Sequence, residues 1–171
     1  VGKVNQSDSS FKQTLIKHGI DCQFLQCVEA PSGHAIIQVT PSGENAIVLF
    51  GGANQEIGSK EILHALDKAR PSDWVLTQNE TSGLAETLQQ AKQKHIKVAF
   101  NPAPMSESVK SLPHECIDLL IVNEVEAAEL SGEQELDAII EHYKTQWSHA
   151  EVIITLGKAG VIMLKNQQTI Q

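Results

Sequence analysis

The spacing of hydrophobic residues divides most of the chain into alternating strands and helices. Short, mostly apolar runs predict strands over residues 74–78, 96–100, 119–122, 151–156 and 161–164. Between these runs, hydrophobic residues recur every three to four positions, which is typical of helices with one buried face. Strands separated by helices of this length indicate βαβ units. We therefore expect an α/β fold built on a mainly parallel sheet.

The predicted helices precede this alternation or connect its strands. They cover residues 11–18, 61–69, 82–95, 106–112, 125–130 and 133–147. Right-handed crossovers place the carboxyl ends of parallel strands along one edge of a sheet. In open α/β sheets, ligands bind at that edge.

Two further strand-like segments precede the regular alternation. Residues 35–40 and 45–50 flank Pro41-Ser42-Gly43-Glu44, which is a strong turn signal. We expect a β-hairpin over residues 33–52 that projects from the main sheet.

The segment from Ile117 to Gly132 brings polar groups to the predicted ligand edge. Its uncharged run 119–122 is typical of a strand covered on both faces, and Asn123 ends that strand. The chain restarts as a helix over 125–130, which Gly132 ends. Asn123 and Glu126 have the spacing of a capping box, and capping is a commoner role than ligand binding. Amide N–H groups at such a turn also attract phosphate, so polar groups at other strand ends decide between the two interpretations.

Polar residues follow four successive predicted strands. They are Glu80, Asn101, Asn123 with Glu124 and Glu126, and Thr155 with Gly157. Four such ends on one edge make a candidate binding site. Singly, each has a structural explanation. Glu80 fits a solvated loop or a helix start, residues 101–104 fit a rigid turn, and residues 155–160 fit a glycine-rich hairpin turn.

Charge and composition exclude several classes of function. The net charge is −8 and no basic patch occurs, so nucleic acid and anionic membranes are not expected partners. No apolar run is long enough to cross a bilayer. The chain has no Gly-x-x-x-x-Gly-Lys-Ser/Thr and no Gly-x-Gly-x-x-Gly, which argues against a P-loop nucleotidase and a standard dinucleotide domain.

The cysteines and histidines do not form a metal-binding pattern. The three cysteines contain no Cys-x-x-Cys pair, and the seven histidines contain no His-x-x-x-His. A structural zinc site is therefore not expected. Three cysteines cannot form a full set of disulfides, which suits the reducing cytoplasm.

Five stretches, in order, resemble the ribokinase-like carbohydrate kinase family and span nearly the whole chain. They are Ser42-Gly43-Glu44-Asn45 with Gly51-Gly52-Ala53-Asn54, Gln78-Asn79-Glu80, Asn101-Pro102-Ala103-Pro104, Asn123-Glu124-Val125-Glu126-Ala127 with Leu130-Ser131-Gly132, and Thr155-Leu156-Gly157-Lys158-Ala159-Gly160. Each stretch is modest alone, but the ordered set is specific. The first and third point to the branch that phosphorylates D-ribose.

The resemblance implies a role for each matching position. Glu80 corresponds to the acid that binds sugar hydroxyls, and Asn123 to the amide near the nucleotide phosphates. Glu126 corresponds to the acid that holds Mg²⁺ through water. The hairpin corresponds to a lid that closes over the sugar and often forms a homodimer contact. The loop against the nucleotide would consist of Thr155, Leu156, Gly157, Lys158, Ala159 and Gly160.

Other elements of the family pattern are expected outside the chain. A sugar-binding aspartate would lie before Val1, which is not a methionine. The Gly-Ala-Gly-Asp stretch, with the general base and the anion hole, would lie after Gln171, as would the potassium site. Within the chain, Asn5-Gln6-Ser7-Asp8 departs from the family's usual Gly-Asp-Asp.

Together these features predict a single, incomplete α/β domain over residues 1–171. It would contain a ribokinase-like, Rossmann-like parallel sheet flanked by helices, with the hairpin as a small lid. The expected activity is ATP-dependent phosphorylation of D-ribose on its 5-hydroxyl, with the fragment itself inactive. A related kinase for fructose or a nucleoside, and a non-catalytic α/β binding module, remain alternatives.

Overall fold

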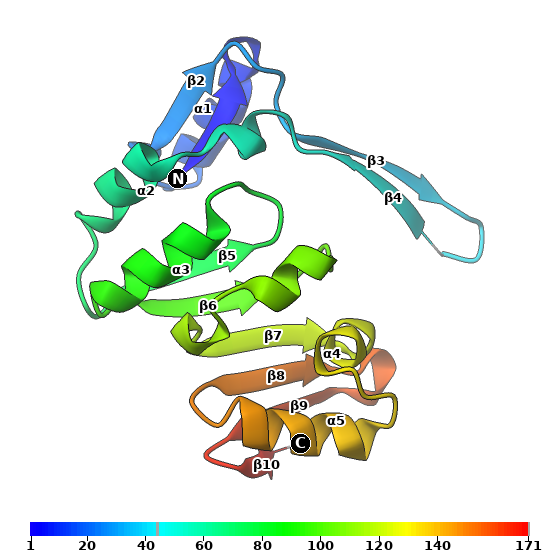
Figure 1. Ribbon diagram of the computed structural model, residues 1–171. Helices are drawn as coiled ribbons and strands as arrows, with labels where there is room; N and C mark the ends of the chain where they lie inside the picture. Colours follow the sequence, from blue (N-terminus) through cyan, green and yellow to red (C-terminus); the bar gives the residue numbers. More distant parts are fainter. Residues whose placement is uncertain (44, 171) are drawn as a thin grey trace. The chain divides into compact units, whose positions relative to one another are not determined.

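A computed structural model describes residues 1–43 and 45–170 (Figure 1). Glu44, in the predicted hairpin turn, and Gln171 lie outside the described residues. The chain divides into two units. The first contains Val1–Asp67 with Glu80–Gly83, and the second contains Lys68–Asn79 with Leu84 onward.

The first unit is built around a pair of parallel strands that are joined through a helix. Its elements are β1 (Gly2–Asn5), η1 (Gln6–Asp8), α1 (Ser9–Lys17), β2 (Leu25–Val28), β3 (His34–Val39), β4 (Asn45–Phe50), η2 (Gly52–Glu56) and α2 (Ser59–Leu66). Strands β1 and β2 pair in parallel. Its small core includes Val4 of β1, Ala53 of η2, and Ile62 and Leu66 of α2.

The predicted hairpin is present in this unit. Strands β3 and β4 pair antiparallel, from His34 opposite Phe50 to Val39 opposite Asn45. Every residue of both strands is exposed, although most are apolar (Figure 1). Both faces of the hairpin are therefore open apolar surfaces.

The second unit contains a six-stranded sheet in the order β10-β9-β8-β7-β6-β5. The strands are β5 (Trp74–Gln78), β6 (Lys97–Asn101), β7 (Leu119–Asn123), β8 (Glu151–Thr155), β9 (Val161–Lys165) and β10 (Gln168–Ile170). Strands β5 to β8 are parallel, as the alternation predicted. Strands β9 and β10 extend the sheet beyond β8 through antiparallel pairs.

The helices of this unit cover one face of the sheet (Figure 1). They are α3 (Leu84–Gln93), α4 (Glu124–Ser131) and α5 (Leu136–Gln146), with short turns η3 (Glu107–Ser111), η4 (His114–Cys116) and η5 (Gly157–Ala159). Strands β5 to β8 follow in sequential order, so right-handed crossovers all fall on the same side. Phe100, Leu120 and Ile154 are buried, whereas Leu119 and Ile121 are only half-buried. The expected cover on both faces of β7 is thus not provided by the described residues.

No helix in the part of the chain that the structure describes has the length and apolar character needed to cross a bilayer.

Candidate functional site

Polar side chains form a row along the carboxyl ends of β5 to β8. Gln78 lies opposite Asn101, and Asn123 lies opposite Thr155. The Gln78 amide donates to Asn101 Oδ1 at 3.1 Å, and Asn101 Nδ2 donates to the Ile121 carbonyl at 2.7 Å. Asn101 therefore connects three strands, which agrees with its interpretation as a structural residue. Asn123 and Thr155, at the ends of β7 and β8, are exposed, as is Gln78 at the end of β5.

Asn123 and Glu126 form the capping box that their spacing predicted. Asn123 Oδ1 accepts from the Glu126 N–H at 2.8 Å, and Glu126 Oε2 accepts from the Asn123 N–H at 2.9 Å. Gly132 ends α4 in the left-handed conformation, with φ 80°. The box uses one Glu126 carboxylate oxygen. The other has no hydrogen bond or ion pair with the described residues, so the carboxylate can still face a ligand.

A buried tyrosine on α5 holds α4 in place through a hydrogen bond. The Tyr143 side chain on α5 is 1% exposed, and its hydroxyl donates to the Ala127 carbonyl at 3.2 Å. Burial, and secondarily the Glu126 carboxylate, raise the pKa of the Tyr143 phenol far above its ordinary range. The hydroxyl therefore stays protonated and remains a hydrogen-bond donor. Sequence analysis did not identify this residue, although it is the only tyrosine in the chain.

Residues 155–160 form the tight turn between antiparallel strands β8 and β9. The Leu156 N–H donates to the Gly160 carbonyl at 2.8 Å, and the Ala159 N–H donates to the Leu156 carbonyl at 2.9 Å. Gly157 and Gly160 have positive φ, and a Cβ at either would meet open space. The turn is thus a glycine-rich hairpin turn, as its simpler interpretation predicted. The side of the turn toward which those Cβ atoms would project is open.

Glu80 is described with the first unit. It is exposed, and its backbone carbonyl accepts from Gln55 Nε2 at 2.8 Å. The next residues are also anchored there, because Ser82 Oγ donates to the Ile57 carbonyl at 2.8 Å. The convergence of Glu80 on one rim with Asn123, Glu126 and Thr155 stays a prediction.

The donor set at the sheet edge bears on which metal ion it could hold. Among the described residues, no group of three or more His, Cys, Asp or Glu side chains is arranged to hold an ion. Glu126, with one carboxylate oxygen uncommitted at the exposed edge, fits an ion that keeps most of its water, as Mg²⁺ does.

Comparison with known proteins gives this geometry a context. The chain matches the pfkB family of carbohydrate kinases over residues 1–171. It is 35% identical to the ribokinase of Haemophilus influenzae over 90% of this chain and 52% of that protein. It is 29% identical to the ribokinase of Staphylococcus aureus over 99% of this chain and 57% of that protein.

A solved structure gives the same result for the fold. The ribokinase of Cryptococcus neoformans var. grubii in complex with ADP matches with a TM-score of 0.78 and 26% identity, covering 98% of this chain and 58% of that one. The chain spans about half the length of the curated relatives that it matches.

Proposed function

Because the chain belongs to the pfkB family of carbohydrate kinases, we propose that it forms the central part of an ATP-dependent sugar kinase that converts D-ribose to ribose 5-phosphate. The observation that carries the proposal is the pairing of Asn123 with Thr155 at the carboxyl edge of a parallel sheet. The turn after β7, which begins helix α4, lies there beside the turn after β8. Free thiols at all three cysteines support a reducing compartment, the cytoplasm.

The nucleotide would lie against the turns that follow β7 and β8. Asn123 would contact its phosphates, and Thr155, Leu156, Gly157, Lys158, Ala159 and Gly160 would line its other side. Both glycines leave the backbone of the second turn accessible, and Lys158 is exposed, with no ion pair among the described residues. The ADP complex of the Cryptococcus relative supports a nucleotide as the ligand.

Mg²⁺ would be held through water by Glu126. When bound, the ion neutralises charge on the transferring phosphates. The chain's own contribution is to fix the carboxylate, which the capping box orients through the Asn123 N–H. We assign no residue of this chain to K⁺.

Positioning is the main requirement of phosphoryl transfer. In this proposal the described residues orient the nucleotide, and the general base would lie outside the 171 residues. We therefore expect no ribose phosphorylation by the 171-residue chain alone. A coupled assay of the full-length protein against D-ribose, D-fructose and a nucleoside tests the substrate. Highest kcat/KM for D-ribose supports the proposal, whereas turnover of none of them favours a non-catalytic module.

Glu80→Ala tests the proposed sugar contact. In the full-length kinase, we expect this change to raise the KM for D-ribose at least about 10-fold, because a carboxylate forms strong hydrogen bonds with hydroxyls. The Kd for ADP should change by less than about 2-fold, because the nucleotide residues are untouched. Glu56→Ala, also exposed and in the same unit, is the matched control. Equal losses of sugar and nucleotide affinity would count against the role of Glu80.

The exposed hairpin would act as a lid and as a homodimer contact. Ile36 pairs with Val48 on one face, and Ile37 pairs with Ile47 on the other. All four side chains are more than half exposed, and apolar faces of this kind are typical of interfaces. One face would close over the sugar while the other meets a second hairpin.

Lysine placed on each face in turn separates these two roles. We expect one of the double variants, Ile36→Lys/Val48→Lys or Ile37→Lys/Ile47→Lys, to sediment as a monomer, since a buried lysine is costly. The other should stay dimeric and lose affinity for sugar. If the parent protein is monomeric, or if both variants sediment as the parent does, the dimer contact is wrong.

A further inference from the structure

Glu80 belongs to a four-residue segment that groups with a different unit from the residues on either side of it. Residues Glu80–Gly83 are part of the first unit, whereas Asn79 and Leu84 are part of the second. The segment is a turn outside any helix or strand. Its position in the first unit therefore depends on the contacts of its individual residues.

The Gln55 side chain on η2 binds the first residue of this segment. Gln55 Nε2 donates to the Glu80 backbone carbonyl at 2.8 Å. The aliphatic part of the Gln55 side chain lies close to Gly51, because a Cβ on Gly51 would meet Gln55 Cγ at 2.6 Å. The missing side chain at Gly51 thus leaves the space through which Gln55 reaches Glu80.

Ser82 and Gly83 hold the other end of the segment. The Ser82 N–H donates to the Asn54 carbonyl at 3.1 Å, and the Ser82 hydroxyl donates to the Ile57 carbonyl at 2.8 Å. Gly83 has a φ of +73°, and a Cβ there would meet Ile62 Cδ1 at 2.5 Å. Ile62 is buried on α2, so the backbone at Gly83 packs directly on the core of the first unit.

These contacts fix the backbone around Glu80 and leave its carboxylate free. The side chain is exposed, and its carboxylate has no hydrogen bond or ion pair with the described residues. The hydrogen-bond partners of the segment lie in η2 and at Ile57, directly after it. Strand β4 of the hairpin leads into η2 through Gly51. The element that follows the hairpin therefore also holds Glu80.

We propose that Gln55 and Ser82 are positioning residues for the sugar contact, and that they act through Glu80 by holding its backbone to η2. The inference rests on the proposed function, because it takes Glu80 as the acid that binds sugar hydroxyls. Neither Gln55 nor Ser82 contacts sugar or nucleotide in that proposal. A carboxylate that is already held in place binds without first being ordered, so the loss of either hydrogen bond raises the KM for the sugar.

Gln55→Ala and Ser82→Ala in the full-length kinase test the two contacts. We expect each to raise the KM for D-ribose about 3- to 10-fold, which is the range for one lost hydrogen bond. The Kd for ADP should change less than about 2-fold. Gln13→Ala, exposed on α1 of the same unit, is the matched control for Gln55→Ala. Ser82→Thr keeps the hydroxyl and should retain most of the sugar affinity. Alanine variants with the KM of the parent protein would overturn the proposal.

A double-mutant cycle separates positioning of Glu80 from a general structural role. If Gln55 and Ser82 act through Glu80, then adding Gln55→Ala or Ser82→Ala to Glu80→Ala should raise the KM for D-ribose less than about 2-fold further. Effects that multiply in full would overturn the proposal. If Glu80→Ala alone leaves the KM unchanged, the proposed sugar contact is wrong, and the positioning role is wrong with it.

Hydrogen exchange provides a measurement that does not depend on the sugar. We expect the amides of residues 80–83 to exchange at least about 3-fold faster in Gln55→Ala and Ser82→Ala than in the parent protein and in Gln13→Ala. Unchanged exchange would show that these hydrogen bonds do not hold the segment. That result would overturn the positioning role and leave the proposed sugar contact of Glu80 intact.

Discussion

Glu126→Gln in the full-length kinase is expected to lower turnover about 10- to 100-fold and to raise the Mg²⁺ concentration needed for half-maximal activity. The substitution removes the negative charge that would hold the ion's water. Because glutamine serves in a capping box as glutamate does, the bond from the Asn123 N–H is kept. Turnover measured against Mg²⁺ at saturating ATP and sugar checks the result.

Thermal unfolding separates this role from helix capping. We expect the melting temperature of Glu126→Gln to stay close to that of the parent protein. Glu129→Gln, exposed on the same helix, carries the same charge change and should leave the Mg²⁺ requirement unaltered. If Glu126→Gln lowers only the melting temperature, capping is its whole role.

Tyr143→Ala is expected to lower the free energy of unfolding of the chain by about 3–5 kcal/mol. The change empties a fully buried position between α5 and α4 and leaves the Ala127 carbonyl without its donor. Ring contacts to Trp147, with centroids 5.9 Å apart, are lost as well. Urea unfolding followed by circular dichroism measures the difference.

A milder variant separates the contribution of the hydroxyl from that of packing, and an exposed site on the same helix serves as the control. Tyr143→Phe removes only the hydroxyl and should cost about 1 kcal/mol, with the remainder due to packing. Thr145→Ala, exposed on the same helix, should stay within about 0.5 kcal/mol of the parent. A loss below about 1 kcal/mol for Tyr143→Ala would show that α4 does not depend on this contact.

The strand-to-helix turn at Asn123 was predictable because all of its signals are local. An aliphatic run, a capping pair and a helix-ending glycine fall within 16 residues, and the structure has β7, the capping box and Gly132 in that order. Strand β5 was also predicted with its observed bounds. The predicted helix over 106–112 is instead the 3-10 turn η3, since a few residues with a proline at either side cannot extend it.

The short strands β1 and β10 were missed for different reasons. Strand β1 has only four residues and includes Gly2 and Lys3, so no alternation is visible, yet it pairs with β2 some 20 residues away. Strand β10 is polar and short. It follows a two-residue turn in which Asn166 and Gln167 both have positive φ. Turns of this kind favour Asn-Gly, so the sequence lacked the usual signal.

The cover of the sheet was predicted only in part. An uncharged run such as 119–122 indicated two buried faces, but Leu119 and Ile121 are half-buried while Leu120 and Val122 are buried. The cause is topological, because sequential strand order places every crossover of this unit on one side. A hydrophobic run alone does not indicate which segment of a protein covers the second face of the sheet.

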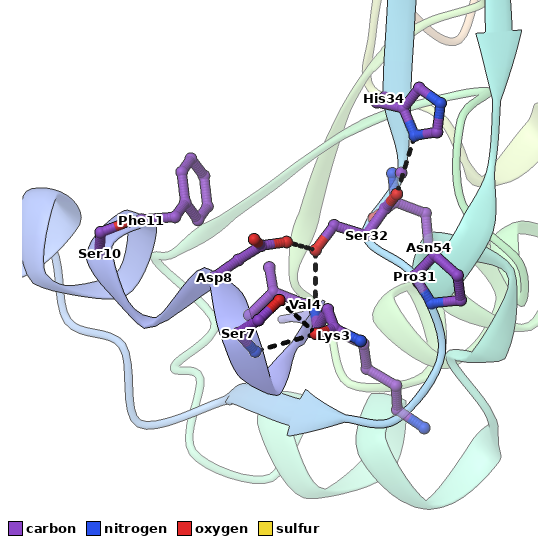
Figure 2. Close-up of a pocket in the computed structure, with 12 residues that line it drawn as sticks. Lys3, Val4, Ser7, Asp8, Ser10, Phe11, Pro31, Ser32, His34 and Asn54 are labelled. Carbon is purple, nitrogen blue, oxygen red and sulfur yellow. Dashed lines mark hydrogen bonds between the residues drawn. The ribbon is translucent and has the colours of Figure 1, made fainter.

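The first unit also contains a cavity of about 720 Å³, lined among others by Asn5, Asp8 and Ser32 (Figure 2), which could not have been found from the same patterns. Asn5-Gln6-Ser7-Asp8 attracted notice only as a departure from a family motif. The hydrogen bond between Asp8 and Ser32 joins residues 24 positions apart. Hydrophobic periodicity does not indicate that the loop before β3 lies at the end of β1.

Hydrogen exchange of the full-length protein with and without Mg²⁺-ADP tests the central claim most directly, namely that the carboxyl edge of β7 and β8 holds the nucleotide. The account predicts slower exchange on binding at residues 123–131 and 155–161, with little change in the hairpin β3–β4. Protection confined to other segments, with both turns exchanging as in the free protein, would contradict it.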